Sequence, residues 1–438
     1  MDMKLLYYIW LGAKLQAGSV SPKILLEYYD CDIEKIYNAS EEDYMKLKIS
    51  KNDIAKLADK DLTDAKHYYE YCAKERVGIL CYDSSFYPQR LKNISNPPPM
   101  FYFKGRVEMF DDYPCFAMVG TRSCSENGIR TAYRMGYEAA MRGAVAVNGI
   151  AAGIDAAVLK GALDADGYVI VFLGNGIDRI YPTSNTELFK RVARRGLILS
   201  EFPPFSKSVG HNFPVRNRCI SGISLASVIF EADKGSGALL TATHAENQGR
   251  PVYAVPGDIN DPLYSGPLEL IKNGAIPITC ADDFVMEYRE LFPHRIETGS
   301  LGTYPVEKEN TAVKEAFGEE TILKRTENPK ITLPKPKRFD KDKNKDKANT
   351  PSVEEIPNSI PNENKTNPES NEHSMLNLSH LSASEAKVIS IMEKSEFVTA
   401  DDIARYGIKI DDALSSLTIL EIYGYVESMP GGRYRIKQ

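Results

Sequence analysis

Two short polar stretches, each following an apolar run, carry residue types suited to holding an anion. Gly120–Arg122 follows the run FAMV, and Lys234–Gly237 follows VIFEA closely. Glycine lets a backbone approach a ligand, and the free amides at a helix start donate hydrogen bonds to an anion. Arginine adds charge-assisted hydrogen bonds that match the geometry of phosphate. The two stretches therefore indicate a ligand that carries phosphate.

Two further stretches extend this pattern and add an aromatic residue. Asn148–Asp155 (NGIAAGID) follows AVAV, and FPVRNRCISG places Phe213 beside Arg216 and Arg218. One glycine by itself is best explained by a tight turn, but several such stretches together favour a ligand. Aromatic residues near basic ones are typical of proteins that bind single-stranded nucleic acid, because every base has a face that stacks. Phe213 also suits a position in the core, and that alternative stays open.

The motifs of cofactor-binding and catalytic sites are missing from the sequence. GNGIDR has only the first two glycines of the dinucleotide pattern G-x-G-x-x-G, because Arg179 stands in place of the third. There is no P-loop motif G-x-x-x-x-G-K-[ST] and no nucleophile motif G-x-S-x-G. The 7 cysteines never form C-x-x-C, and the 6 histidines never form H-E-x-x-H. We therefore predict a protein that binds without catalysis and uses no cofactor or metal.

The composition of the 438 residues is that of an ordinary globular protein, with 43% hydrophobic and 26% charged residues. The net charge of −6 counts mildly against a polyanionic partner, although a basic patch can lie on an acidic protein. No apolar run is long enough to span a bilayer, and the N-terminus lacks the features of a signal peptide. Scattered cysteines suit a reducing compartment. These features predict a cytoplasmic protein without membrane association.

Short apolar runs, from CFAMV at residue 115 to IPIT at residue 276, alternate with helix-like segments. Strands that are apolar throughout indicate a parallel sheet with helices on both faces. We predict an α/β fold with an extended Rossmann-like, doubly wound, mostly parallel sheet over residues 76–295. Because ligands of such folds bind at the carboxyl ends of the strands, the polar stretches are expected at one edge of the sheet.

The segments on either side of the predicted sheet have other patterns. Residues 1–75 show helical spacing around short turns, which suits a SAM-like or helix-hairpin-helix-like module, or a helical cap packed on the sheet. Residues 296–375, rich in Lys, Asn, Pro and Glu, predict a disordered linker. Residues 376–438 predict a winged helix, with three amphipathic helices and a hairpin that turns at MPGG. Its third helix carries Asp411, Asp412 and Glu421 without a basic residue between them, so protein contact or self-association suits it at least as well as DNA.

Taken together, these stretches resemble the DNA-processing protein A family (DprA/Smf). The resemblance rests on YPQRLKNISNPPPMFYFKG, MVGTRSCSENG, NGIAAGID, LGNGIDRIYPTSN, LILSEFPP, FPVRNRCISG, EADKGSGALLTATHA, GRPVYAVPGDI and LIKNGAIPI, in this order over about residues 87–285. It implies a non-enzymatic protein that binds and protects incoming single-stranded DNA, as a homodimer through the Rossmann-like domain. It also implies a partnership with the RecA recombinase, which the family loads onto the strand during natural transformation.

The candidate DNA-binding residues come from the four polar stretches, and most are carried over from the family pattern. They are Gly120, Thr121, Arg122, Asn148, Gly149, Gly153, Asp155, Phe213, Arg216, Asn217, Arg218, Lys234, Ser236 and Gly237. The chain departs from the pattern at Asn148 and Ala238, where the family usually has serine, and at Ala152, where it usually has arginine. The missing arginine implies weaker binding of DNA, unless Lys207 or Lys234 supplies the charge.

Two functions of other classes stay open on the sequence alone. A nucleotide-processing enzyme with a Rossmann-like fold, of the phosphoribohydrolase type, would also need glycine-rich turns that hold phosphate, and release of ribose would favour it. A protein-interaction scaffold would act through the predicted winged helix, so that deleting residues 300–438 would abolish partner binding and leave DNA binding intact.

Overall fold

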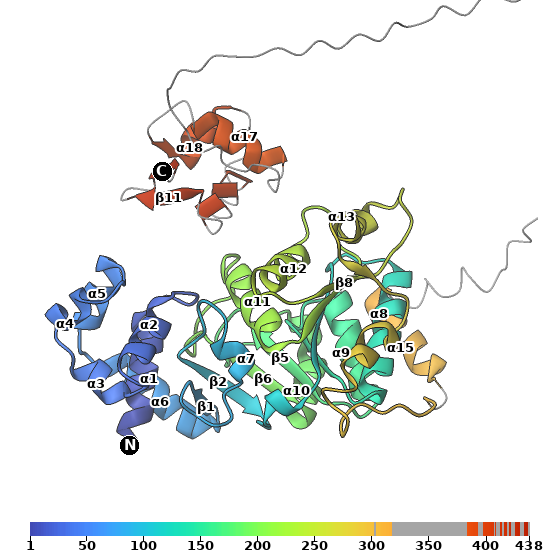
Figure 1. Cartoon of the computed structure of the whole chain (residues 1–438), viewed down its shortest axis with the longest axis horizontal. Coiled ribbons are helices and arrows are strands. Elements are labelled where there is room, and N and C mark those ends of the chain that lie inside the picture. Colours follow the sequence, from blue (N-terminus) through green and yellow to red (C-terminus); the bar gives the residue numbers. More distant parts are fainter. Residues whose placement is uncertain are drawn as a thin grey trace, which may run out of the picture. The chain divides into compact units, whose positions relative to one another are not determined.

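A nine-stranded sheet with helices on both faces forms the centre of the larger of two units in this computed structural model (Figure 1). The two units span Met1–Pro334 and Lys335–Gln438. The structure describes residues 1–301, 304–317 and 383–392, and residues 397–436 with gaps at 407, 409–411, 414–415, 418–419, 422–424 and 430–432.

The strands of the large sheet follow the order β1-β2-β6-β5-β4-β3-β7-β8-β9. They are β1 (Gly78–Cys81), β2 (Met100–Gly105), β3 (Cys115–Val119), β4 (Val145–Asn148), β5 (Val169–Leu173), β6 (Leu197–Ser200), β7 (Ala226–Ile229), β8 (Val252–Ala254) and β9 (Ile276–Pro277). Strands β3 to β9 pair in parallel, whereas β1 and β2 pair antiparallel beyond β6. The chain winds outward from β3 to β6 and then returns to β7 on the other side of β3. The predicted doubly wound, mostly parallel sheet is thus confirmed. From β3 the next strands are added toward one side of the sheet and from β7 toward the other. In sheets of this kind the loops that follow two such strands lead away in opposite directions, and ligands bind in the crevice between them.

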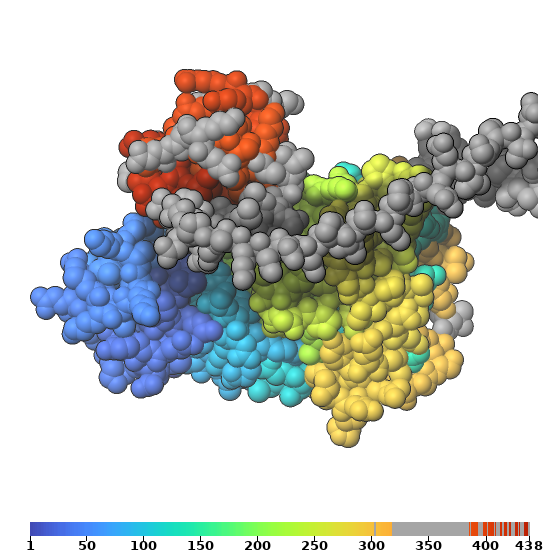
Figure 2. Space-filling view, turned by 45° about the horizontal axis from the view of Figure 1, so that its top comes forward, coloured from blue at the N-terminus to red at the C-terminus, as the bar shows by residue number. Residues whose placement is uncertain are grey.

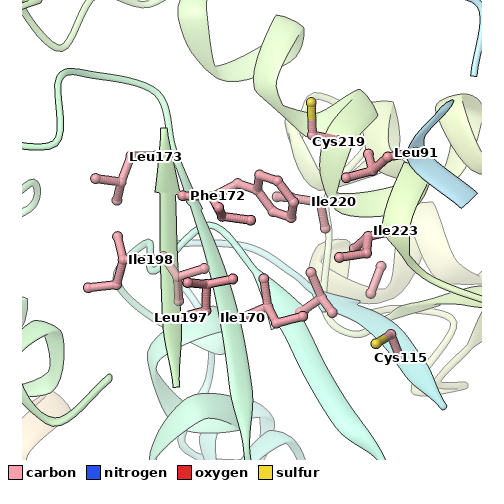
Figure 3. Packing of buried hydrophobic residues seen from close by; sticks show 14 of the residues in the cluster. Leu91, Cys115, Ile170, Phe172, Leu173, Leu197, Ile198, Cys219, Ile220 and Ile223 are labelled. Atoms are coloured by element: carbon pink, nitrogen blue, oxygen red, sulfur yellow. The ribbon is translucent and has the colours of Figure 1, made fainter. Parts of the chain in front are cut away.

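Helices cover both faces of the sheet. On one face lie α8 (Glu126–Met141), α9 (Ile154–Asp164) and α10 (Thr186–Arg195), and on the other lie α7 (Gln89–Lys92), α11 (Asn212–Ile223) and α12 (Ala238–Asn247); α13 (Ser265–Lys272) and α14 (Asp282–Val285) follow. Figure 3 shows Phe172 of β5 directed toward Ile220 of α11. Strands β3 and β5 are buried on both faces, which is why they read as unbroken apolar runs.

The helices that precede the sheet belong to the same unit. They are α1 (Met3–Lys14), α2 (Ser21–Tyr28), α3 (Ile33–Asn38), α4 (Glu41–Met45), α5 (Lys51–Ala58) and α6 (Thr63–Glu75). Helix α1 packs on β1 and β2, and its Leu6 and Trp10 belong to the same buried cluster as Phe172 of the sheet. Figure 2 shows these helices, in blue, continuous with the surface of the first strands. This packing is the arrangement expected of a helical cap.

The structure differs from the expected linker over 296–375 in its first part. Helix α15 (Val306–Phe317) packs on α8 and α9, and its Val313 is fully buried. Arg130 of α8 donates a hydrogen bond to the side-chain oxygen of Asn310 at 2.7 Å. Seven of its 12 residues are polar or charged. Short helices are marginal in water, so this one depends on tertiary packing, which the local composition does not reveal. The remainder of the expected linker lies outside the described residues.

The smaller unit carries a three-stranded sheet in the order β10-β12-β11. Its elements are α17 (Ala383–Met392), β10 (Val398–Thr399), α18 (Ala400–Ala404), β11 (Val426–Met429) and β12 (Arg433–Ile436). The antiparallel pairing of β11 and β12 gives the hairpin predicted for the wing. Ala413, Leu417 and Leu420 are helical and buried in one cluster with Ile389, as expected for one face of the predicted third helix. Asp411, which the sequence also assigned to this third helix, lies outside the described residues.

Candidate nucleic-acid interface

The four polar stretches meet at the carboxyl edge of the parallel strands. The loops after β3 and β4 are joined by a hydrogen bond from Ile154 N–H to the Thr121 carbonyl, 3.2 Å long. Thr121 N–H donates to the Glu231 carbonyl at the end of β7, over 2.7 Å. The side-chain amide of Asn217 in α11 donates to the Gly237 carbonyl, at 3.2 Å, just before α12 begins. The structure therefore brings together the stretches that the sequence predicted at one edge.

Asn148 and Asp155 shape the loop after β4 from inside the protein. The fully buried Asn148 amide donates to the carbonyls of Met118 and Asp155, at 3.3 and 3.0 Å. The Asp155 carboxylate accepts hydrogen bonds from the Gly149 and Ala151 N–H groups, at 3.0 and 3.4 Å. Both side chains therefore position the loop backbone, and neither presents its polar atoms to solvent.

Arg216 of α11 lies against this loop and is only 6% exposed. Its guanidinium donates to the carbonyls of Gly149, at 3.2 Å, and Phe172. Burial lowers the pKa of Arg216 to about 10 and the negative Asp155 opposes that shift, so Arg216 is charged at neutral pH. Burial likewise raises the pKa of the Asp155 carboxyl, with Arg216 as the main opposing influence. A Cβ atom on Gly149 would lie 2.3 Å from Arg216 Nη2, so a larger residue here would displace the buried guanidinium.

Arg122, Phe213 and Tyr181 form the accessible part of the site. The Arg122 guanidinium lies 5.1 Å from the centre of the Phe213 ring. The Tyr181 ring, 42% exposed, lies 5.7 Å from the half-buried Phe213 ring. Arg122 is exposed and forms no ion pair with any residue that the structure describes. The guanidinium beside the Phe213 ring offers a phosphate contact, and the Phe213 and Tyr181 rings offer stacking faces for bases.

The position of Arg218 does not suit the DNA contact predicted for it. Its side chain is 3% exposed and forms an ion pair with Glu201 at 2.8 Å. It also donates to the carbonyls of Asn96 and Val215, at 3.1 and 2.8 Å. Residues two apart on a helix are rotated by about 200° about the helix axis, so their side chains leave it on nearly opposite sides. The RNR pattern in α11 therefore could not place both arginines at one site. We therefore assign Arg218 a structural role.

The loop after β7 contributes the remaining candidate residues. Lys234 is 74% exposed and lies 3.6 Å from the Glu269 carboxylate of α13. Ser236 Oγ accepts a weak hydrogen bond from Ala238 N–H at 3.4 Å, and Gly237 is exposed at the start of α12. Exposed pairs such as Lys234–Glu269 are weak, so Lys234 remains available to a phosphate.

Three side chains of this edge were missed by the sequence prediction. Besides Tyr181, these are Asn185, which donates to the Ile150 carbonyl at 2.9 Å, and Glu231. The buried Glu231 carboxylate accepts a hydrogen bond from Ser125 N–H at 2.7 Å and so ties the start of α8 to the end of β7. Tyr181 could have been identified from the aromatic residue in RIYP, close behind the glycine pair of GNGIDR. The roles of Asn185 and Glu231 depend on partners distant in sequence.

In the described ranges, no three or more His, Cys, Asp and Glu side chains are grouped so that they could hold a metal ion. None of the helices described is both long enough and apolar enough to cross a bilayer.

The fold and the site together define an extended Rossmann-like protein whose strand ends carry cations and aromatic rings in place of a dinucleotide fingerprint. The chain belongs to the DNA recombination-mediator protein A family (DprA/Smf), whose family model matches residues 78–289. The family predicted from the sequence motifs is thus confirmed.

Bacterial relatives support this assignment. The DNA processing protein DprA of Bacillus subtilis is 32% identical over 276 residues, which cover 62% of this chain and 92% of that protein. Protein Smf of Escherichia coli is 38% identical over 230 residues, covering 50% of this chain and 61% of that protein. The X-ray structure of DprA from Streptococcus pneumoniae matches with a TM-score of 0.50 and 28% identity, over 63% of this chain and 96% of that one.

Proposed function

We propose that the protein binds single-stranded DNA along the carboxyl edge of the large sheet and acts in DNA processing and recombination. The observation that carries this proposal is the exposed Arg122 guanidinium beside the Phe213 ring, with Tyr181 next to it. Such a site binds one phosphate and stacks bases without reading their sequence. The names of the family and of its relatives support a DNA substrate.

The finer functions that the family resemblance implies are part of this proposal. The protein would protect the incoming strand, load the RecA recombinase and form a homodimer through the Rossmann-like domain, in the cytoplasm. It would act by binding and not by catalysis. Incubation with AMP tests the last point, because release of ribose phosphate would favour the phosphoribohydrolase alternative.

Replacing Arg122 by alanine is expected to weaken binding of oligo-dT at least about tenfold, because one charge-assisted phosphate contact is lost. The slope of log affinity against log salt should fall by about 0.7, the value for one phosphate on a single strand. Fluorescence anisotropy of a labelled oligonucleotide over a salt series measures both quantities. Arg194→Ala is the matched control, since the exposed Arg194 lies near the end of α10, at the opposite edge of the sheet. Equal binding by both variants and the wild type, or wild-type binding independent of salt, would overturn the proposal.

Replacing Ala152 by arginine is expected to strengthen oligo-dT binding several-fold and to steepen the salt slope by about 0.7. Ala152 is partly exposed and precedes Gly153, whose Cβ, if present, would lie 2.7 Å from the Arg122 carbonyl oxygen. A guanidinium at this position therefore joins the edge that carries Arg122. Ala152→Leu adds bulk without charge and should leave the slope unchanged. A slope that is the same in the wild type and Ala152→Arg would show that the strand does not pass this loop.

A further inference from the structure

Phe205, in the loop after β6, is an exposed aromatic residue in an unfavourable backbone conformation. Its side chain is 43% exposed, and its φ of 71° lies in the left-handed region, which bulky residues avoid. The turn is held by two hydrogen bonds, from Phe205 N–H to Asp178 Oδ1 at 2.6 Å and from Gly176 N–H to the Ser206 carbonyl at 3.1 Å. The protein thus maintains a strained turn that leaves a large aromatic ring partly in solvent, as functional positions often do.

Two further rings gather around Phe205, and both come from α6. The ring centres of His67 and Tyr71 lie 5.4 and 4.9 Å from that of Phe205. His67 is exposed and Tyr71 is half-buried. We call these three side chains the Phe205 platform. Lys207, two residues further along the same loop, is exposed and carries a positive charge.

The loop after β5 connects the Phe205 platform with the site at Arg122. At its beginning, Gly174 lies so close to Phe213 that a Cβ atom would be 2.8 Å from the ring. Further along, Gly176 and Asp178 hold the turn that carries Phe205. Strands β5 and β6 are neighbours and run in parallel, so both aromatic sites lie at the carboxyl edge of the same sheet. One short loop therefore has an aromatic site on each side.

We propose that the Phe205 platform stacks a base of the same DNA strand that Arg122 and Phe213 bind, so that the binding track continues past β6 to α6. This inference rests on the proposed function, since it extends that site. A contact serving only to pack α6 on the sheet would be made by a buried side chain in a relaxed conformation. The exposed face of Phe205 and the nearby Lys207 instead provide what a flanking nucleotide needs, a stacking surface and a cation.

The test compares a short oligo-dT of about 6 nucleotides, which the Arg122 site can occupy by itself, with one of about 20 nucleotides that spans both sites. Phe205→Leu keeps an apolar side chain but removes the ring, and is expected to weaken binding of the long strand at least about fivefold. Its affinity for the short strand and its salt slope should match the wild type, because no phosphate contact is lost. Phe86→Leu is the matched control, since Phe86 is 45% exposed elsewhere in the same unit.

A 2-aminopurine base placed along the long strand gives a direct readout of stacking. Its fluorescence should be quenched at one position by the wild type and by Phe86→Leu, and should recover in Phe205→Leu. Equal binding of the long strand by Phe205→Leu and the wild type would overturn the proposal that the platform stacks a base. An equal loss of affinity for the short and the long strand, together with a lower melting temperature of Phe205→Leu, would overturn it as well. Absence of any DNA binding by the wild type would instead overturn the proposed function itself. Loss of binding in Arg122→Ala with no effect of Phe205→Leu would leave that function intact and reject only the extended track.

Discussion

Replacing Arg218 by alanine is expected to lower the free energy of unfolding by about 3–5 kcal/mol, the usual cost of removing one partner from a buried ion pair. Glu201 would keep a buried charge without its guanidinium partner at 2.8 Å. Glu201 Oε1 also accepts the Gly18 N–H at 3.2 Å, and Asn96 donates from its amide to the Gly18 carbonyl at 2.8 Å. Arg218 therefore connects β6 and α11 with the segment between α1 and α2, and its loss should loosen the helical cap.

Urea unfolding followed by circular dichroism measures this effect. Arg195→Ala is the matched control, because the Arg195–Asp166 pair is exposed and such pairs contribute about 0–1 kcal/mol. The double variant Arg218→Met with Glu201→Leu should recover most of the stability, since it removes both buried charges together. Folded Arg218→Ala should bind oligo-dT with an affinity close to the wild type. A stable Arg218→Ala with strongly weakened DNA binding would contradict the structural role and restore this arginine to the interface.

Replacing Asp155 by alanine is expected both to destabilise the protein, by about 3 kcal/mol or more, and to reduce DNA binding about a hundredfold. The substitution removes the negative charge next to the buried Arg216 guanidinium. It also leaves the N–H groups of Gly149 and Ala151 without their acceptor. An unpaired buried donor is costly, so the loop is expected to rearrange and displace the edge that carries Arg122 and Phe213.

Asp155→Asn provides the graded comparison for this prediction, since it keeps one acceptor oxygen and loses the charge. We expect its stability and DNA affinity to lie between those of the wild type and Asp155→Ala. Asp112→Ala, at an exposed aspartate, should match the wild type in both measurements. Unfolding by urea and anisotropy of oligo-dT, recorded on the same preparations, separate the two effects. Full DNA affinity in Asp155→Ala would show that the loop after β4 does not organise the interface.

The arginines of the site fall into two groups, those with buried and those with exposed guanidinium groups. Arg216 and Arg218 have their donors bound inside the protein and stabilise loops and helix packing, whereas Arg122 is exposed to solvent. DNA affinity should therefore respond directly to Arg122, and indirectly to the Asp155–Arg216 pair that positions the loop next to it. Salt dependence distinguishes the two cases, because only a residue that contacts phosphate changes the number of ions released on binding.

The sheet and the location of the site followed from local patterns. Unbroken apolar runs such as CFAMV occur where both faces of a strand are buried, and this condition leaves a clear trace in the sequence. Glycine-rich stretches after those strands then indicated the carboxyl edge, which the structure confirms. Helix α15 left no comparable trace, because its stability depends on packing against α8 and α9 and not on its own composition.

The sequence by itself determined the family, the doubly wound sheet and the edge at which its polar loops gather, since these depend on residue type and spacing along the chain. Only the tertiary structure decided which side chains face solvent there. It placed Arg218 in a buried ion pair, brought Tyr181 beside Phe213, and assembled the Phe205 platform from α6 and the loop after β6. The physical reason is that burial and pairing depend on neighbours distant in the chain: two arginines in one RNR motif have different surroundings once α11 has packed on the sheet.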